Sequence, residues 1–242
     1  MNNKFINTLN TRIGRTIIKQ KLITGGDRVL VALSGGKDSL VLLEALADRK
    51  RHFPFKFDLY AAHITIKGIG YKTDVDYLKS LCNELGVEFV NKEAEIGRQG
   101  GKKKTECFLC SWHRRKALFA LTKQLNCNKL AFGHHMDDAV ETLLMNMVFH
   151  GSVSSMPFEI EMFDGRVKII RPMLEISESE IKEYEQLKKF RKEVKICPFS
   201  NNKRAEMKDL LKNISKIRKN GLINIFRSMD NIYLDYLPHW KM

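Results

Sequence analysis

The apolar residues near the start of the chain switch between the two periods of regular secondary structure. Residues 28–33 (RVLVAL) form a short, β-branched and nearly all-apolar run, which is typical of a strand buried on both faces of a parallel sheet. From residue 39 to residue 47 the apolar spacing becomes helical, and residues 57–66 again have the composition of a strand. The three segments predict a β-α-β unit.

The same alternation continues farther along the chain. Further helices are predicted over residues 75–85, 112–125 and 137–149. Further strands are predicted over residues 87–90, 129–132 and 168–170. Strands that alternate with helices in this way predict an α/β fold built on a doubly wound parallel sheet.

Both ends of the chain have a helical pattern. Residues 1–26 carry apolar side chains at helical spacing and close on Gly25 and Gly26, while the chain beyond residue 177 is helical and basic. A chain of 242 residues is long enough for one core with a small appendage. We therefore expect a main domain over residues 1–176 and a short helical C-terminal extension over residues 177–242.

The charge balance points to a polyanionic partner. The chain has 42 Lys and Arg against 28 Asp and Glu, a formal net charge of +14, which favours nucleic acid although a solvated lysine surface would give the same total. Between residues 98 and 123 the only acid is Glu106. The basic residues of this segment are Arg98, Lys102, Lys103, Lys104, Arg114, Arg115, Lys116 and Lys123. Because these charges are clustered, we expect nucleic acid to dock on this segment.

The sequence does not predict a membrane protein. No apolar run approaches the roughly 20 residues of a membrane-spanning helix, and the first fifteen residues lack the apolar core of a signal peptide. We therefore expect a cytoplasmic protein with no membrane partner. In that reducing compartment the five cysteines are not expected to form disulfides, so a close pair is better interpreted as metal-binding or catalytic.

A glycine-rich turn follows the first predicted strand. Residues 34–39 (SGGKDS) lie between a buried strand and a helix, where backbone N–H groups and the helix dipole converge on an anion. Their spacing differs from the Walker A loop and from the dinucleotide fingerprint. A turn with a serine cap would account for the glycines and Ser39, but not for the whole string. The segment resembles the PP-loop of the N-type ATP pyrophosphatases, which have an adenine nucleotide alpha hydrolase-like fold and cleave ATP between its α and β phosphates.

This resemblance implies that ATP binds to every residue of the loop. These residues are Ser34, Gly35, Gly36, Lys37, Asp38 and Ser39. The glycines would let the backbone approach a phosphate, the serines would hydrogen-bond its oxygens, and the lysine would add a positive charge. Asp38 would assist the binding of magnesium or substrate, which makes it the catalytic candidate of the loop.

A second motif follows a later predicted strand. Residues 133–138 (GHHMDD) resemble the GHHxDD segment of tRNA-modifying members of the same superfamily. The resemblance places Gly133 and His134 near the nucleotide and makes Asp137 and Asp138 available to magnesium. Two other interpretations remain open, because histidines and acids at this spacing can bind a metal themselves and the acids can cap the helix that follows.

His63 is a third candidate for the nucleotide site. It lies near the end of the second predicted strand, where related enzymes use backbone groups to hold adenine. The alternative is an ordinary histidine at the end of a strand.

The cysteines indicate which branch of the superfamily the chain resembles. Cys107 and Cys110 are three residues apart, and Cys197 follows in a later basic segment. Two such thiolates can share a metal, but a structural zinc site normally has four ligands, so three cysteines leave one position open. The arrangement resembles the tRNA 2-thiocytidine synthetase family, in which three cysteines hold a [4Fe-4S] cluster. Zinc and a redox disulfide are the alternatives, and Cys82 and Cys127 are expected to be structural.

The resemblance to this family extends from about residue 10 to the C-terminus. The shared segments are CxxCxxxRR at 107–115, GHHxDD, Ile170-Arg171-Pro172 and FRSMDN at 226–231. The chain departs from the family in the loop at 64–71 and around Cys197, where the family often has CxxC and this chain has CPFS. The second cysteine of that pair is not a ligand in the family, so the three implied ligands are all present.

The resemblance implies a two-step reaction on tRNA. The O2 atom of a tRNA cytidine, at position 32 of the anticodon loop, would attack the α-phosphate of ATP bound with Mg²⁺, and pyrophosphate would leave. Sulfide delivered on the cluster would then attack C2 and expel AMP, so Cys107, Cys110 and Cys197 would be both ligands and catalytic residues. The expected partners are tRNA and a cysteine desulfurase or other sulfide or persulfide donor, and a homodimer is also considered. The C-terminal extension would complete the cluster and tRNA sites.

Two alternative functions share part of this sequence signature. A lysidine synthetase performs the same adenylation but attacks with lysine and needs no cysteine triad. A non-catalytic iron–sulfur protein that binds RNA would use ATP only as a ligand, and the intact loop at residues 34–39 argues against it.

Overall fold

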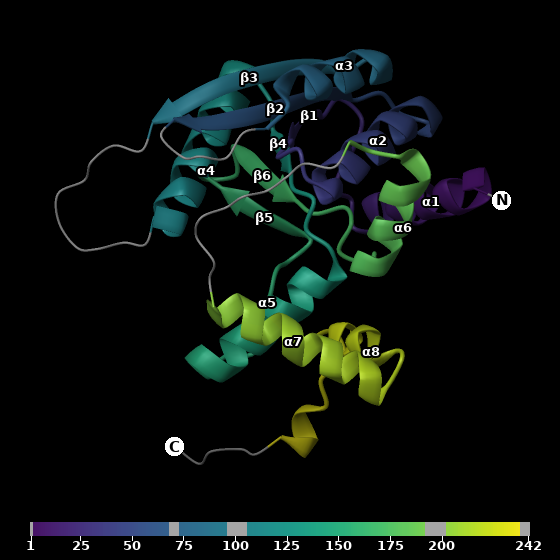
Figure 1. Cartoon of the computed structure of the whole chain (residues 1–242), viewed down its shortest axis with the longest axis vertical. Helices are drawn as coiled ribbons and strands as arrows, with labels where there is room; N and C mark the ends of the chain where they lie inside the picture. The colour runs from purple at the N-terminus through teal and green to yellow at the C-terminus, as the bar shows by residue number, and fades with distance from the viewer. Residues whose placement is uncertain (1, 68–72, 96–105, 192–201, 238–242) are drawn as a thin grey trace. The chain divides into compact units, whose positions relative to one another are not determined.

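The chain folds around a twisted, mostly parallel sheet. A computed structural model describes residues 2–67, 73–95, 106–191 and 202–237 (Figure 1). In sheet order the strands of the described part are β3 (Glu88–Glu95), β2 (Asp58–Lys67), β1 (Arg28–Ala32), β4 (Lys129–Ala131), β6 (Val167–Ile170) and β5 (Glu159–Met162). All pairs are parallel except β5 with β6. This arrangement confirms the predicted α/β fold.

The described residues form two compact units. The first contains the sheet and the helices α1 (Asn2–Lys19), α2 (Lys37–His52), α3 (Val75–Leu85), α4 (Glu106–Gln124) and α6 (Glu178–Lys188). The second contains α5 (Met136–His150), α7 (Asn202–Ile217), α8 (Gly221–Ser228) and the 3₁₀ turn η1 (Leu234–Tyr236). Helix α6 lies beyond the predicted domain boundary at residue 176 but belongs to the first unit. Helix α5 lies before that boundary but belongs to the second unit.

Strand β1 shows why the sheet of the first unit is covered on both faces. Its side chains alternate across the sheet, so Val29 and Val31 enter one apolar core while Leu30 enters another. The first core contains buried residues of α1, α2, α3 and α6, and the second contains residues of α4. Figure 1 shows these helices on opposite sides of the sheet. The all-apolar run at residues 28–33 is therefore explained by burial on both faces.

Two strands differ from the sequence prediction. Strand β3 continues to Glu95, beyond the predicted end at residue 90, and β5 was not predicted. Both strands lie at the edges of the sheet and carry exposed polar side chains. An apolar pattern does not detect such strands, because only their backbone pairing with β2 or β6 defines them.

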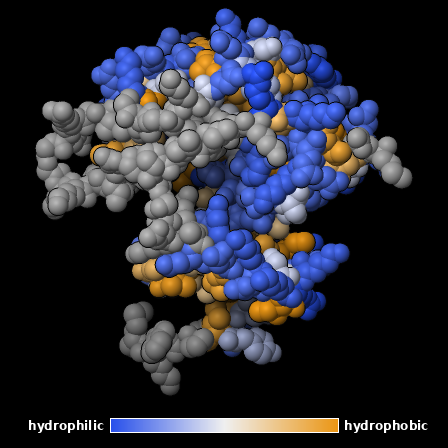
Figure 2. All heavy atoms as spheres, in the orientation of Figure 1, coloured by the Kyte–Doolittle hydropathy of each residue, from blue (hydrophilic) through white to orange (hydrophobic). Residues whose placement is uncertain are grey.

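The surface of the second unit is more apolar than that of the first. Most of the large apolar side chains that the described residues expose belong to it, and Figure 2 shows orange patches over this part of the chain. They include Met147, Phe149, Val153, Ile217, Leu234 and Tyr236. Across the described ranges, no helix has the length and apolar character needed to cross a membrane.

A buried polar contact fixes α6 on α2. The Tyr184 hydroxyl donates a hydrogen bond of 3.0 Å to Oε2 of the buried Glu44, which also accepts one of 2.9 Å from Nζ of Lys188. A buried carboxylate is stable only while such donors satisfy it. The contact sets where the first turn of α6 lies, and that turn contributes to the site described below.

Replacing Tyr184 with Phe should lower the free energy of unfolding by about 1.5–3 kcal/mol, because the ring stays while the hydrogen bond to a charged acceptor is lost. Urea unfolding would measure the change. Lys182→Met is the control, since its ion pair with Glu178 is on the surface and should contribute less than about 1 kcal/mol. Equal losses in both variants would contradict the prediction.

Candidate functional site

The candidate site lies at the topological switch point of the sheet. There, the chain stops adding strands on one side of β1 and begins to add them on the other side. Strand β1 pairs with β2 on one side and with β4 on the other, so the carboxyl ends of β1 and β4 are adjacent. In open α/β sheets, ligands bind in the crevice at this position. The segment 33–36 follows β1 and the segment 132–135 follows β4, so the two sequence motifs meet at one edge of the sheet.

The turn after β1 is held together by its own serines. Backbone N–H groups of Ser34 and Gly36 donate to Oγ of Ser39 and Oγ of Ser34, at 3.1 and 3.3 Å. Oγ of Ser39 in turn donates to the carbonyl of Gly36 at 2.9 Å. Gly35 has a φ of +86°, a conformation that favours glycine. The turn is therefore shaped before any ligand arrives.

The start of α2 is open to an anion. Its N-cap residue is Gly36, which has no side chain to accept hydrogen bonds from the first backbone N–H groups of the helix. These donors and the helix dipole point to the crevice at the end of β1. The local geometry thus fits the phosphate-binding role predicted for residues 34–39.

Lys37 lies between two carboxylates. Its Nζ is 2.7 Å from Oδ1 of Asp38 and 3.5 Å from Oε1 of Glu178, at the start of α6. Burial opposes the charged form of Lys37, but the hydrogen bond and charge of Asp38, together with Glu178, outweigh burial and raise its pKa. Lys37 is therefore protonated at neutral pH. Sequence reasoning missed Glu178, because no local pattern links positions 37 and 178.

The position of Glu178 follows from the cap of α6. Ser177 and Glu180 form a capping box, in which the Ser177 side chain accepts from the Glu180 backbone and the Glu180 side chain accepts from the Ser177 backbone. Burial raises the pKa of Glu178, but hydrogen bonding to Lys182 and the nearby charges of Lys37 and Lys182 outweigh burial and lower the pKa. Glu178 is thus an ionised partner for Lys37.

The two loops touch through their backbones. A Cβ atom on Gly133 would lie 2.8 Å from the carbonyl oxygen of Asp38 and 3.1 Å from the backbone nitrogen of Ser39. Real Cβ atoms do not approach backbone this closely, so only glycine fits. His135, which is buried, brings Nε2 to 3.8 Å from Oδ1 of Asp38. The structure therefore brings Gly133 and His135 together with the SGGKDS loop.

The other histidines support this edge of the sheet. His63 is buried in β2, and its Nδ1 is 2.8 Å from the carbonyl oxygen of Leu33, to which it donates in the matching tautomer. The His134 ring lies beside Phe132, with 5.5 Å between ring centroids. His63 lies in the middle of β2, not near the end of the strand as predicted, and connects this strand to the turn that is predicted to bind phosphate.

Asp137 and Asp138 lie in the first turn of α5, in the second unit. Acids in this position interact favourably with the positive end of the helix dipole. This placement fits stabilisation of the helix, and the contact of these acids with magnesium stays a prediction.

The structure describes only part of the cysteine triad. Cys110 is half-buried on α4, the side chain of Cys107 is outside the described part, and so is all of Cys197. Positions 107 and 110 lie in the first turn of α4 and share one face of the helix, which fits two ligands of one cluster. Within the described ranges, no three potential ligands gather in one place.

Cys82 and Cys127 have the properties of structural residues. Both are buried, and burial raises the pKa of Cys82 to about 12 and that of Cys127 to about 11. A thiol with so high a pKa forms little of the thiolate that metals and clusters bind.

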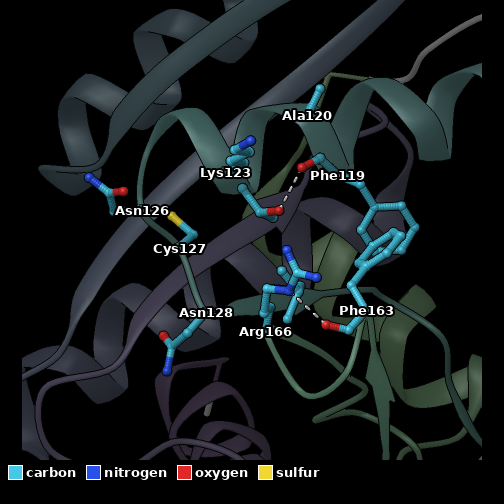
Figure 3. A pocket seen from close by; sticks show the side chains of 10 residues that line it. Phe119, Ala120, Lys123, Asn126, Cys127, Asn128, Phe163 and Arg166 are labelled. Atoms are coloured by element: carbon cyan, nitrogen blue, oxygen red, sulfur yellow. Dashed lines mark hydrogen bonds between the residues drawn. The ribbon is translucent and has the colours of Figure 1, made fainter.

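A cavity of about 530 Å³ lies at the opposite, amino edge of the sheet (Figure 3). It is lined by the end of α4, the turn before β4 and the β5–β6 turn, and Phe119, Cys127, Phe163 and Arg166 are among its residues. The Phe119 and Phe163 rings meet edge to face, with centroids 4.9 Å apart. None of the residues predicted to bind the nucleotide or the cluster lines the cavity, because the strands carry those residues to the opposite, carboxyl edge.

Gly133→Ala should lower the free energy of unfolding by about 1–3 kcal/mol, since the new methyl group would push against the Asp38 backbone. Gly25→Ala is a matched control, because its Cβ would make only ordinary contact with the Phe55 side chain, at 3.5 Å. Urea unfolding of both variants would test this. A loss in Gly25→Ala as large as in Gly133→Ala would show that the loop contact is not the cause.

Known proteins resemble this chain over most of its length. A family model described as a PP-loop domain matches residues 6–194. The tRNA-cytidine(32) 2-sulfurtransferases of Paraburkholderia phytofirmans and Paraburkholderia xenovorans are each 34% identical, over 100% of this chain and 73% of theirs. The solved structure of the U34-tRNA thiolase NcsA from Methanococcus maripaludis, with its [4Fe-4S] cluster, has a TM-score of 0.76 and 25% identity, over 98% of this chain and 81% of that one. The chain therefore belongs to the PP-loop family and, within it, to the family of the tRNA-cytidine(32) 2-sulfurtransferases.

Proposed function

We propose that the protein is an ATP-dependent tRNA sulfurtransferase that converts cytidine 32 to 2-thiocytidine. The observation that carries this proposal is the contact of the GHH loop with the SGGKDS loop at the switch point, in a chain related over its whole length to enzymes of that name. The relatives do not favour a lysidine synthetase or a non-catalytic RNA-binding protein.

The turn at residues 34–39 would bind the phosphates of ATP. Its glycines would let the phosphates approach the backbone, and its serines would donate hydrogen bonds to them. The backbone N–H groups at the start of α2, which no side chain caps, face the same crevice. Lys37 is held protonated by Asp38 and Glu178, so its charge is available to oppose the negative charge that accumulates at the α-phosphate. The backbone of His63, within β2, is also proposed to help hold the adenine.

Asp38 is the proposed catalytic carboxylate of the nucleotide site. It lies beside Lys37 and His135 at the carboxyl edge, where the α-phosphate would meet the cytidine O2. Mg²⁺, when bound, would neutralise charge on the phosphates, and Asp38 is the residue of the first unit proposed to contact it. Attack of O2 on the α-phosphorus forms the O–P bond and breaks the bond to pyrophosphate.

Cys107, Cys110 and Cys197 are the proposed ligands of a [4Fe-4S] cluster. The placement of positions 107 and 110 on one helical face supports a shared site for the first two. When held by these cysteines, the cluster would supply a coordination position for sulfide, which is a substrate of the reaction. The C2–S bond then forms as the C2–O bond to AMP breaks.

The proposed partners follow from the charge and surface of the chain. Lys102, Lys103 and Lys104 lie outside the described residues, while Arg114 and Arg115 lie on α4 and support docking of tRNA near the cysteines. A cysteine desulfurase or other persulfide donor would supply the sulfur. The exposed apolar side chains of the second unit support a homodimer, and a cytoplasmic location fits a tRNA substrate.

Deleting the gene should remove 2-thiocytidine from tRNA, as measured by mass spectrometry of tRNA nucleosides. The wild-type gene should restore it and a gene with Asp38→Ala should not. Asp58→Ala is the control, because that exposed carboxylate lies at the amino edge beside Arg28 and should not affect the reaction. In vitro, Asp38→Ala and Ser34→Ala should abolish the tRNA-dependent release of pyrophosphate. If the wild-type products are ADP and phosphate, the assignment of the loop is wrong.

The protein purified without oxygen should be brown and contain about four iron atoms. Cys110→Ala and Cys197→Ala should lose the iron, whereas Cys82→Ala and Cys127→Ala should keep it, because those thiols are buried and remain protonated. Iron analysis and the visible absorption spectrum would measure this. A colourless protein with one stoichiometric zinc ion would contradict the prediction.

A further inference from the structure

Arg171 has a distinctive place at the active edge of the sheet. It follows β6 directly, and the preceding residue, Ile170, accepts a backbone hydrogen bond of 3.0 Å from Phe132. Residue 171 is therefore next to the start of the GHH loop. Its backbone N–H donates to Phe158 at 2.9 Å, and its Nη1 donates to the carbonyl of Pro157 at 2.7 Å. These bonds hold the guanidinium group in one place.

The charge of Arg171 is not balanced by any residue that the structure describes. Its Nε is buried and has no hydrogen-bond partner, and within the described ranges the residue forms no ion pair. Burial lowers the pKa of Arg171, and the positive charge of Arg115 on α4 lowers it further. Arg115 is exposed and also has no carboxylate partner among the described residues. Two nearby cations and a buried, unused N–H group form a site that an anion would stabilise.

A phosphate is the anion that this arrangement fits best. A guanidinium group offers N–H donors in a planar fork that matches phosphate oxygens, and a single phosphate has enough oxygens to meet two arginines. A carboxylate from the chain itself would have been the simplest partner, and the described residues supply none. As far as the described residues are concerned, the site is therefore open to a phosphate ester from outside.

The position of Arg171 favours RNA over the nucleotide as the source of that phosphate. Strand β6 is two strands from β1, so the ends of these strands are about 10 Å apart, and Arg171 follows β6 on the side away from β2 and His63. The nucleotide phosphates already have the donors at the start of α2. We propose that Arg171, with Arg115, binds a backbone phosphate of the RNA substrate beside the target nucleoside. This inference rests on the proposed function, and it makes Arg171 a positioning residue.

The test compares tRNA binding by the full-length wild-type protein and by Arg171→Gln. The affinity for a tRNA transcript, measured by fluorescence anisotropy, should fall about tenfold, or about 1.4 kcal/mol. The slope of log affinity against log salt should become shallower by about 0.7–0.9, the effect of one lost phosphate contact. The affinity for ATP should stay within about twofold of the wild-type value. In turnover, KM for tRNA should rise while KM for ATP does not.

Three further variants separate this role from a structural one. Arg171→Lys keeps the charge but lacks the fork, and should recover part of the affinity. Arg115→Gln changes an exposed position and should also weaken tRNA binding, so it tests the proposal even if Arg171→Gln does not fold. The double variant should lose less binding free energy than the sum of the two single losses, because both arginines hold one phosphate. Arg166→Gln is the matched control, since that exposed arginine lies by the cavity at the amino edge (Figure 3) and should bind tRNA like the wild type.

The outcomes distinguish this inference from the proposed function. If the wild type thiolates tRNA but Arg171→Gln and Arg115→Gln bind tRNA with unchanged affinity and salt slope, the inference is wrong and the function stands. If the variants lose affinity for ATP instead of tRNA, the phosphate belongs to the nucleotide and the inference is also wrong. If the wild type does not thiolate tRNA, the proposed function fails, whatever the binding data show for Arg171.

Discussion

The close approach of Gly133 to the backbone of Asp38 and Ser39 is the constraint on which the rest of the site depends. It is possible only because β4 pairs directly with β1, so that the turns after the two strands meet at one edge. The contact leaves no room for a Cβ atom, and it therefore fixes the distance between the two motifs. His135 reaches Asp38 from the same loop, which places its ring beside the first turn of α2.

The charges of the site are arranged by helices rather than by the turn alone. Lys37 belongs to α2, but one of its two carboxylate partners comes from α6. That helix is fixed in turn by its capping box and by the buried contact between Tyr184 and Glu44. A cation held between two carboxylates stays protonated and is oriented before a ligand binds, which reduces the reorganisation that binding requires.

The two edges of the sheet serve different purposes because its strands are parallel. The turns that are predicted to carry chemistry follow the carboxyl ends of β1 and β4, and Arg171, whose charge no described residue balances, follows β6 at the same edge. The amino edge carries the aromatic cavity and the buried thiol of Cys127 instead. This segregation places the proposed nucleotide turn and the proposed RNA contact at the same edge of the sheet, with β4 between them.

The sequence by itself determined the alternation of strands and helices, the two loop motifs and the close pair of cysteines. These features depend on short-range periodicity and spacing, which a single chain displays directly. The tertiary structure decided which residues far apart in sequence become partners. The ion pair of Lys37 with Glu178, the backbone contact of Gly133 with Asp38 and the placement of Arg171 beside the GHH loop are examples. None of these has a local signal, because each depends on how the strands are ordered in the sheet and on how the helices pack against its faces.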